Sequence, residues 1–120
     1  MEKIDLENRL IDFSVLIIDI VNEIPKTFAG TNLAGQLVRS GTSPALNYGE
    51  AQGGESRKDF IHKLKIVSKE LNETKVWLEI IKRSNMLTYE KIKSIFDECD
   101  ELCRIIGSSI KTTVNRRNNR

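Results

Sequence analysis

A heptad pattern over positions 60–81 constrains the fold of this chain more than any other feature. Large apolar residues and one threonine recur there at alternating spacings of four and three: Phe60, Leu64, Val67, Leu71, Thr74, Leu78 and Ile81. This repeat is typical of a helix that packs one face into a left-handed bundle. Ser56 supplies a capping hydroxyl near its start, and Lys82 and Arg83 lie where cations stabilise a helix C-terminus.

Two further segments carry apolar stripes with helical spacing. The stripe of residues 5–24 consists of Leu6, Leu10, Phe13, Ile17, Ile20 and Ile24, and Pro25 ends that helix. Val15, Ile18 and Val21 widen this stripe, so we expect the helix to be covered on more than one side, as in a bundle that oligomerises. The stripe of residues 88–114 consists of Ile92, Phe96 or Ile95, Cys99, Leu102, Ile106 and Ile110, with Thr88 as N-cap.

The segment from Thr31 to Gln52 is rich in small residues, which allow neighbouring helices to approach closely. Pro44 lies in its middle and removes one backbone donor, so we expect a continuous helix that is kinked near Pro44. The alternative is a full break, in which Ser43 caps a new helix that starts at Pro44.

These patterns predict an all-α fold, an up-down-up-down antiparallel four-helix bundle, because the segments are joined by loops of only a few residues. A length of 120 residues fits one domain. We expect residues 1–114 to form the bundle and residues 115–120 to form a basic, disordered tail.

Composition and the N-terminus indicate a cytoplasmic protein without a membrane partner. Two cysteines cannot build a disulfide framework, which favours a reducing compartment. The chain starts with acidic residues where a signal peptide would be basic. Its most apolar run, residues 13–21, contains Asp19 and falls short of the roughly 20 residues that span a bilayer.

Residues that could support catalysis or metal binding are sparse. His62 is the one histidine and lies three residues after Asp59, with no cysteine near it in sequence. Cys99 and Cys103 share a helix face but lack a second pair of ligands, so core packing is the better interpretation. We predict no catalytic site, no metal and no cofactor. A small hydrolase that uses Glu50 with Asn47 or His62 is the least favoured function.

Two polar stripes are candidates for binding. The first runs along the small-residue helix and contains Arg39, Ser43, Asn47 and Glu50, in line with Asn32 and Gln36. It predicts a subunit or ligand contact, and the alternative is a solvated face or an internal polar network. The second stripe could follow phosphates, together with the basic C-terminus, or could be a solvated face. Its residues and those of the C-terminus are Lys58, His62, Lys65, Lys69, Arg116, Arg117 and Arg120.

Three sequence blocks, residues 39–52, 55–64 and 69–78, resemble the bacterial four helix bundle protein family. That family includes proteins encoded in intervening sequences of large-subunit ribosomal RNA genes, and it is similar to the accessory variability determinant of diversity-generating retroelements. The matching positions are Arg39, Ser43, Asn47, Glu50, Ser56, Asp59, Phe60, Leu64, Glu73 and Trp77. This chain differs from many relatives at residues 47–51, where they carry Asn-Ile-Ala-Glu-Gly.

The resemblance implies a four-helix bundle that assembles as a ring-like homopentamer, in a family whose members mostly have no known role. We therefore expect a non-enzymatic, homo-oligomeric scaffold or accessory protein whose main partner is itself. The alternative is a nucleic-acid-binding accessory protein, because the retroelement protein binds nucleic acid and its reverse transcriptase. RNA, DNA or another protein is then the partner.

Overall fold

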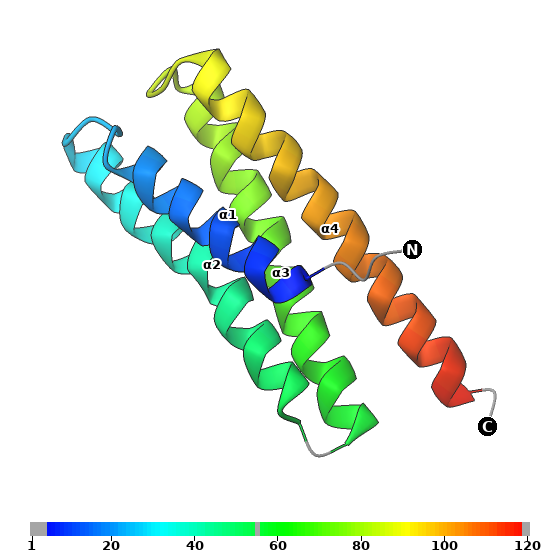
Figure 1. The fold of residues 1–120 in the computed structure, drawn as a ribbon. Helices are drawn as coiled ribbons and strands as arrows, with labels where there is room; N and C mark the ends of the chain where they lie inside the picture. Colours follow the sequence, from blue (N-terminus) through cyan, green and yellow to red (C-terminus); the bar gives the residue numbers. More distant parts are fainter. Residues whose placement is uncertain (1–4, 55, 119–120) are drawn as a thin grey trace.

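The computed structural model describes residues 5–54 and 56–118, which form four helices and no strand. The helices are α1 (Leu6–Val21), α2 (Phe28–Gln52), α3 (Arg57–Arg83) and α4 (Tyr89–Asn118). In Figure 1 each helix turns back along the one before it, and the four lie side by side as a bundle. The predicted all-α four-helix bundle is confirmed. None of the described helices is both long enough and apolar enough to cross a lipid bilayer.

Side-chain caps fix where three helices begin. Asp5, Thr27 and Ser56 each accept a hydrogen bond from the backbone N–H three residues later, at 3.0–3.1 Å. The cap at Thr27 starts α2 three residues earlier than the sequence pattern predicted. α3 ends at Arg83, and Asn85 just beyond it has a left-handed φ of 59°, while the N–H of Met86 donates back to the Ile81 carbonyl at 3.3 Å.

The predicted apolar stripes form the core. The six stripe residues predicted for 5–24 are buried, five of them in α1 and Ile24 beyond its end, and the apolar stripe of α3 is buried from Leu64 to Ile81. Phe60 is an exception, since it is only partly buried and Ile61 takes the core position. On α4 the core position belongs to Ile95, and Phe96 packs at its edge. Neighbouring apolar residues fit the same period, so helix packing decides between them.

Pro44 is buried inside α2, and the helix is continuous across it. The alternative of a full break with a new helix at Pro44 is therefore wrong. The kink near Pro44 stays a prediction. The missing N–H deprives only the Ser40 carbonyl of its usual partner, and one such loss does not end a helix that is packed on both sides.

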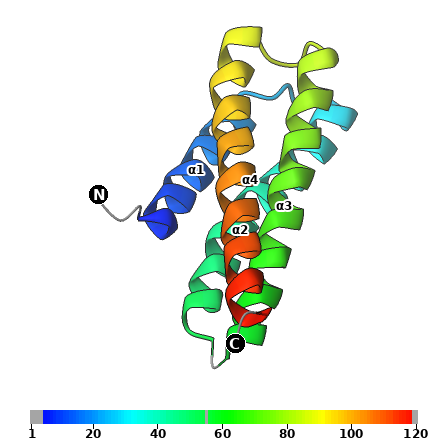
Figure 2. The same ribbon diagram turned by 90° about the vertical axis from the view of Figure 1, so that its right-hand side faces the viewer.

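The four helices are arranged around the bundle in chain order. α1 packs against α2 and α4, and α3 packs against α2 and α4. Within the described residues α1 and α3 make no contact, so they lie diagonally opposite each other. Figure 2 shows that α1 ends well short of the far end of the bundle, while α2, α3 and α4 continue.

Unequal helix lengths leave one end of the bundle without a fourth helix. α1 has 16 residues and α4 has 30, which correspond to about 24 Å and 45 Å of helix. A groove of about 620 Å³ follows the uncovered part of α4, where Phe60 and Arg116 are among the lining residues. Phe60 lines this groove with its partly buried ring and packs at the edge of the core.

α4 extends to Asn118, four residues beyond the end that the sequence pattern predicted at Val114. Residues 115–118, which were assigned to the basic tail, are therefore helical. Asn119 and Arg120 lie outside the described residues. The division into a bundle and a tail stays a prediction.

Gly41 lies at a close approach of α2 to α1. A Cβ atom at this position would lie 2.8 Å from two side-chain carbons of Ile17, at the branch point of a core residue. Gly35, in the same helix, has no atom within 4 Å of the equivalent position. The two glycines therefore provide a matched pair for testing this contact.

We expect Gly41→Ala to lower the free energy of unfolding by about 1–3 kcal/mol, because the new methyl overpacks Ile17. Gly35→Ala should raise it by about 0.5–1 kcal/mol, because alanine has the higher helix propensity. Urea unfolding followed by circular dichroism at one fixed protein concentration measures both changes. Equal effects of the two substitutions would contradict a tight α1–α2 contact.

Candidate functional site

Charged side chains join α2 to α3 along their outer edge, which we call the α2–α3 seam. Arg39 of α2 forms ion pairs with two carboxylates of α3, Glu70 at 3.1 Å and Glu73. Glu50, near the C-terminal end of α2, pairs with Lys63 at 2.5 Å. Because Arg39 and Glu50 both bond to α3, the two ends of the predicted polar stripe face the seam. Exposed pairs of this kind contribute little stability, about 0–1 kcal/mol each.

The residues in the middle of the polar stripe form hydrogen bonds within α2. The amide of Asn47 donates to the Ser43 carbonyl at 3.0 Å and to the Ser43 hydroxyl at 2.9 Å. Both side chains are partly buried. The structure thus brings Arg39 and Glu50 to α3, but it gives Ser43 and Asn47 a local role in their own helix.

A buried hydroxyl pair lies beneath the seam. Thr74 Oγ1 donates to Ser40 Oγ at 2.9 Å, and it also lies 2.8 Å from the Glu70 carbonyl. Both residues are completely buried, and no other polar residue among the described ones has that burial. This hydrogen bond satisfies two polar groups that would otherwise be costly inside an apolar core.

Trp77 lies farther along the same seam, beside a shallow cavity of about 390 Å³. The other lining residues are Gln36, Arg39, Glu73, Val76 and Ile80. Three family-motif positions, Arg39, Glu73 and Trp77, therefore meet at one place. The indole nitrogen of Trp77 is buried and has no acceptor among the residues that the structure describes.

The predicted phosphate-contacting residues that the structure describes lie on α3 and in the last turns of α4. Lys58, Lys65 and Lys69 are exposed on α3 and form no ion pair within residues 5–54 and 56–118. Arg116 lines the groove at the end of α4, near Arg57. Arg117 belongs to α4, and Arg120 lies outside the described residues.

The remaining motif residues have structural positions. Ser56 caps α3, and its hydroxyl accepts from the backbone N–H of Asp59, which is itself exposed in the first turn. Leu64 is fully buried in the core. His62 is exposed. Helix capping and core packing therefore account for Ser56 and Leu64.

Cys99 packs in the core, as its place in the apolar stripe predicted. Its Sγ lies 3.3 Å from the Leu71 carbonyl. A hydrogen bond with Cys103 and burial raise the pKa of Cys99, and the same hydrogen bond lowers the pKa of the half-buried Cys103. Nowhere in the described part of the chain do three or more histidine, cysteine or carboxylate side chains gather as metal ligands.

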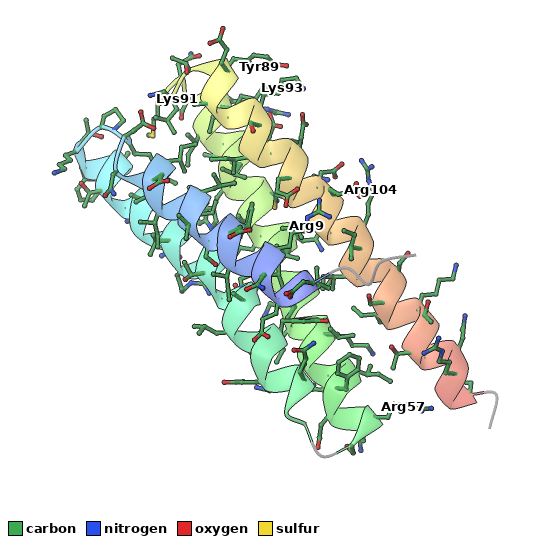
Figure 3. The ribbon with its side chains drawn as sticks, viewed as in Figure 1. Arg9, Arg57, Tyr89, Lys91, Lys93 and Arg104 are labelled. Atoms are coloured by element: carbon green, nitrogen blue, oxygen red, sulfur yellow. The ribbon has the colours of Figure 1, made fainter. Side chains whose placement is uncertain are left out.

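Sequence reasoning missed the ion pairs that fasten α4. Lys75 bonds to Asp100 at 2.7 Å, which holds the pKa of Asp100 below its usual value. Arg9, labelled in Figure 3, pairs with Glu98 at 2.8 Å and ties α1 to α4. Both pairs join different helices, so no spacing within one segment could have revealed them.

The chain matches known proteins over most of its length. The family described as 23S rRNA-intervening sequence protein matches residues 2–108. A crystal structure of a protein with unknown function from the S23 ribosomal protein family of Bacteroides thetaiotaomicron VPI-5482 is 37% identical in sequence. The two chains superpose with a TM-score of 0.81, and the matched region covers 88% of this chain and 98% of the other chain. No curated protein matches.

The buried hydroxyl pair allows a test of the α2–α3 contact. Thr74→Val should lower the free energy of unfolding by about 1–3 kcal/mol, because it leaves the Ser40 hydroxyl with only a long contact to a carbonyl. Adding Ser40→Ala should recover most of this loss, since both polar groups are then gone. Urea unfolding of the two single variants and the double variant measures the coupling. Simple additivity would mean that the two hydroxyls do not interact.

Proposed function

Since the chain belongs to the 23S rRNA-intervening sequence protein family, whose solved relative is described as a protein of unknown function, we propose a role from its own surface. It is a non-enzymatic helical scaffold or accessory protein that assembles into a homo-oligomer. A ring-like pentamer is the form that the family resemblance favours. The site of assembly is the outward face of α1.

One observation carries this proposal. Ile11, Val15 and Ile18, which we call the α1 ridge, recur at spacings of four and three and are 46%, 51% and 45% exposed. The outward face of a helix in a soluble bundle is normally polar. Single exposed apolar residues are common, but a continuous apolar strip on one helix face supports a protein interface.

The non-enzymatic part of the proposal rests on Glu50, the carboxylate that a hydrolase would use. Its side chain is 60% exposed and is held by Lys63. A general base works from a pocket that excludes bulk water and holds the base against the substrate. Glu50 is instead exposed and paired with Lys63, so we assign it a structural role and not a catalytic one.

The mass of the protein in solution tests self-association. At micromolar concentration, light scattering after size exclusion should give a multiple of the 13.7 kDa chain mass. Val15→Glu should reduce that mass to one chain, because a carboxylate in the middle of the α1 ridge cannot be buried without a partner. Ser94→Glu, which adds the same charge to an exposed position of α4, should leave the mass unchanged. A wild-type mass of one chain would refute the proposal.

Nucleic-acid binding is the second candidate function, and the unpaired cations of α3 favour it. Lys58, Lys65 and Lys69 lie on one helix face with no carboxylate partner in the described part of the chain. Such a row of free ammonium groups suits successive phosphates and carries no base specificity. We propose that RNA or DNA binds along this face.

Fluorescence anisotropy with labelled RNA and duplex DNA across a salt series tests this candidate. Replacing the three lysines by glutamate should weaken binding equally for all sequences and lower the salt slope by about three. The control replaces Lys26, Lys82 and Lys111, which are exposed elsewhere, and so makes the same change in net charge. Equal losses in both triple variants would assign the effect to net charge and not to this face.

A further inference from the structure

The outward face of α3 has two chemically different halves. We call it the α3 ridge, and its residues recur at helical spacings: Lys58, His62, Lys65, Lys69, Asn72, Val76 and Ile80. The N-terminal half is basic and the C-terminal half is apolar, with Val76 58% exposed and Ile80 41% exposed. No carboxylate occurs at any ridge position.

The α1 ridge has the complementary composition. Beside its apolar residues lie Asp12 and Asp19, which are exposed and form no ion pair with any described residue. Arg9, the one cation of α1, is turned toward Glu98 of α4. The exposed surface of α1 is therefore apolar and acidic, where that of α3 is apolar and basic.

The two ridges also match in length. The 16 residues of α1 and the 16 residues of α3 from Lys65 to Ile80 each span about 24 Å. A helix of the length of α1 can therefore cover the apolar end of the α3 ridge and reach its lysines at the same time. Val76 and Ile80 would meet Val15 and Ile11, while Asp19 would approach Lys69.

Because α1 and α3 are diagonal in the bundle, their ridges point away from each other on opposite sides of the molecule. One copy cannot bring its own two ridges together. Two surfaces that differ but complement each other produce a heterologous, head-to-tail contact between copies. Every copy in such an assembly uses both ridges, except at an open end.

We propose that the partner of the α1 ridge is the α3 ridge of a second copy of this chain. This inference rests on the proposed self-association and assigns the second half of its interface. Ile11 and Val15 of one copy pack on Ile80 and Val76 of the next, which places Asp19 beside Lys69, with Lys65 one turn beyond it. The same lysines are then covered and cannot contact phosphates along this face.

Two variants that each block one ridge test the head-to-tail arrangement. Val15→Glu blocks the α1 ridge and Val76→Glu blocks the α3 ridge, and both residues are exposed, so each variant should keep the wild-type circular dichroism spectrum. Alone, each should sediment as one chain at about 100 µM. Mixed in equal amounts, they should form a heterodimer of twice 13.7 kDa and nothing larger, because one intact ridge of each kind remains.

The outcomes separate this inference from the proposed function. If Val15→Glu is monomeric but Val76→Glu keeps the wild-type mass, self-association stands and the assignment of α3 is overturned. If both variants are monomeric and their mixture stays monomeric, the two ridges are not each other's partners. A monomeric wild-type protein would overturn the proposed function itself.

Exchanging the charges between the two ridges tests independently how much ionic contacts contribute to assembly. Asp12→Lys with Asp19→Lys should weaken assembly at least tenfold, and so should Lys65→Glu with Lys69→Glu. Combining all four substitutions restores opposite charges across the contact and should recover assembly. Neither a destabilised fold nor binding of nucleic acid by the lysines would produce this recovery of assembly. Failure of the fourfold variant to assemble, with its helicity intact, would exclude these ion pairs.

Discussion

Burial of the apolar stripe of α3 is the interaction on which the other three helices depend. Leu64, Val67 and Leu71 are fully buried, as are Leu78 and Ile81 farther along the same face. α3 is in contact with both α2 and α4, and α1 completes the core from the opposite corner. Because the inward face of α3 is fully used in this way, its outward face is free to carry lysines and exposed apolar residues without affecting the fold.

The polar groups of the bundle follow from the same constraint. Where α2 and α3 approach most closely, the seam admits the small hydroxyls of Ser40 and Thr74, which satisfy each other. Longer charged side chains, such as Arg39, reach across only at the outer edge, where water still surrounds them. The α2–α3 contact thus changes from a buried hydroxyl pair inside to solvated ion pairs at its outer edge.

Helix periodicity predicted the elements and most of the core, because core residues must repeat with the helix turn. It could not choose between Phe60 and Ile61 or between Ile95 and Phe96, since both members of each pair fit the period. That choice depends on where the neighbouring helix ends. The partners of Arg39 were also beyond prediction, because they depend on how α2 and α3 are aligned along their axes. The bonding of Asn47 to Ser43 was within reach, since the two are four residues apart.

The position of Trp77 has a practical consequence. It is the one tryptophan of the chain, and it lies between α2 and α3 next to Arg39 and Glu73. Its fluorescence therefore reports on a single helix contact and not on an average over the molecule. Separation of α2 from α3 would expose the indole to water and shift its emission to longer wavelengths. The single tryptophan thus serves as an optical probe at the place where Arg39 and Glu73 meet it.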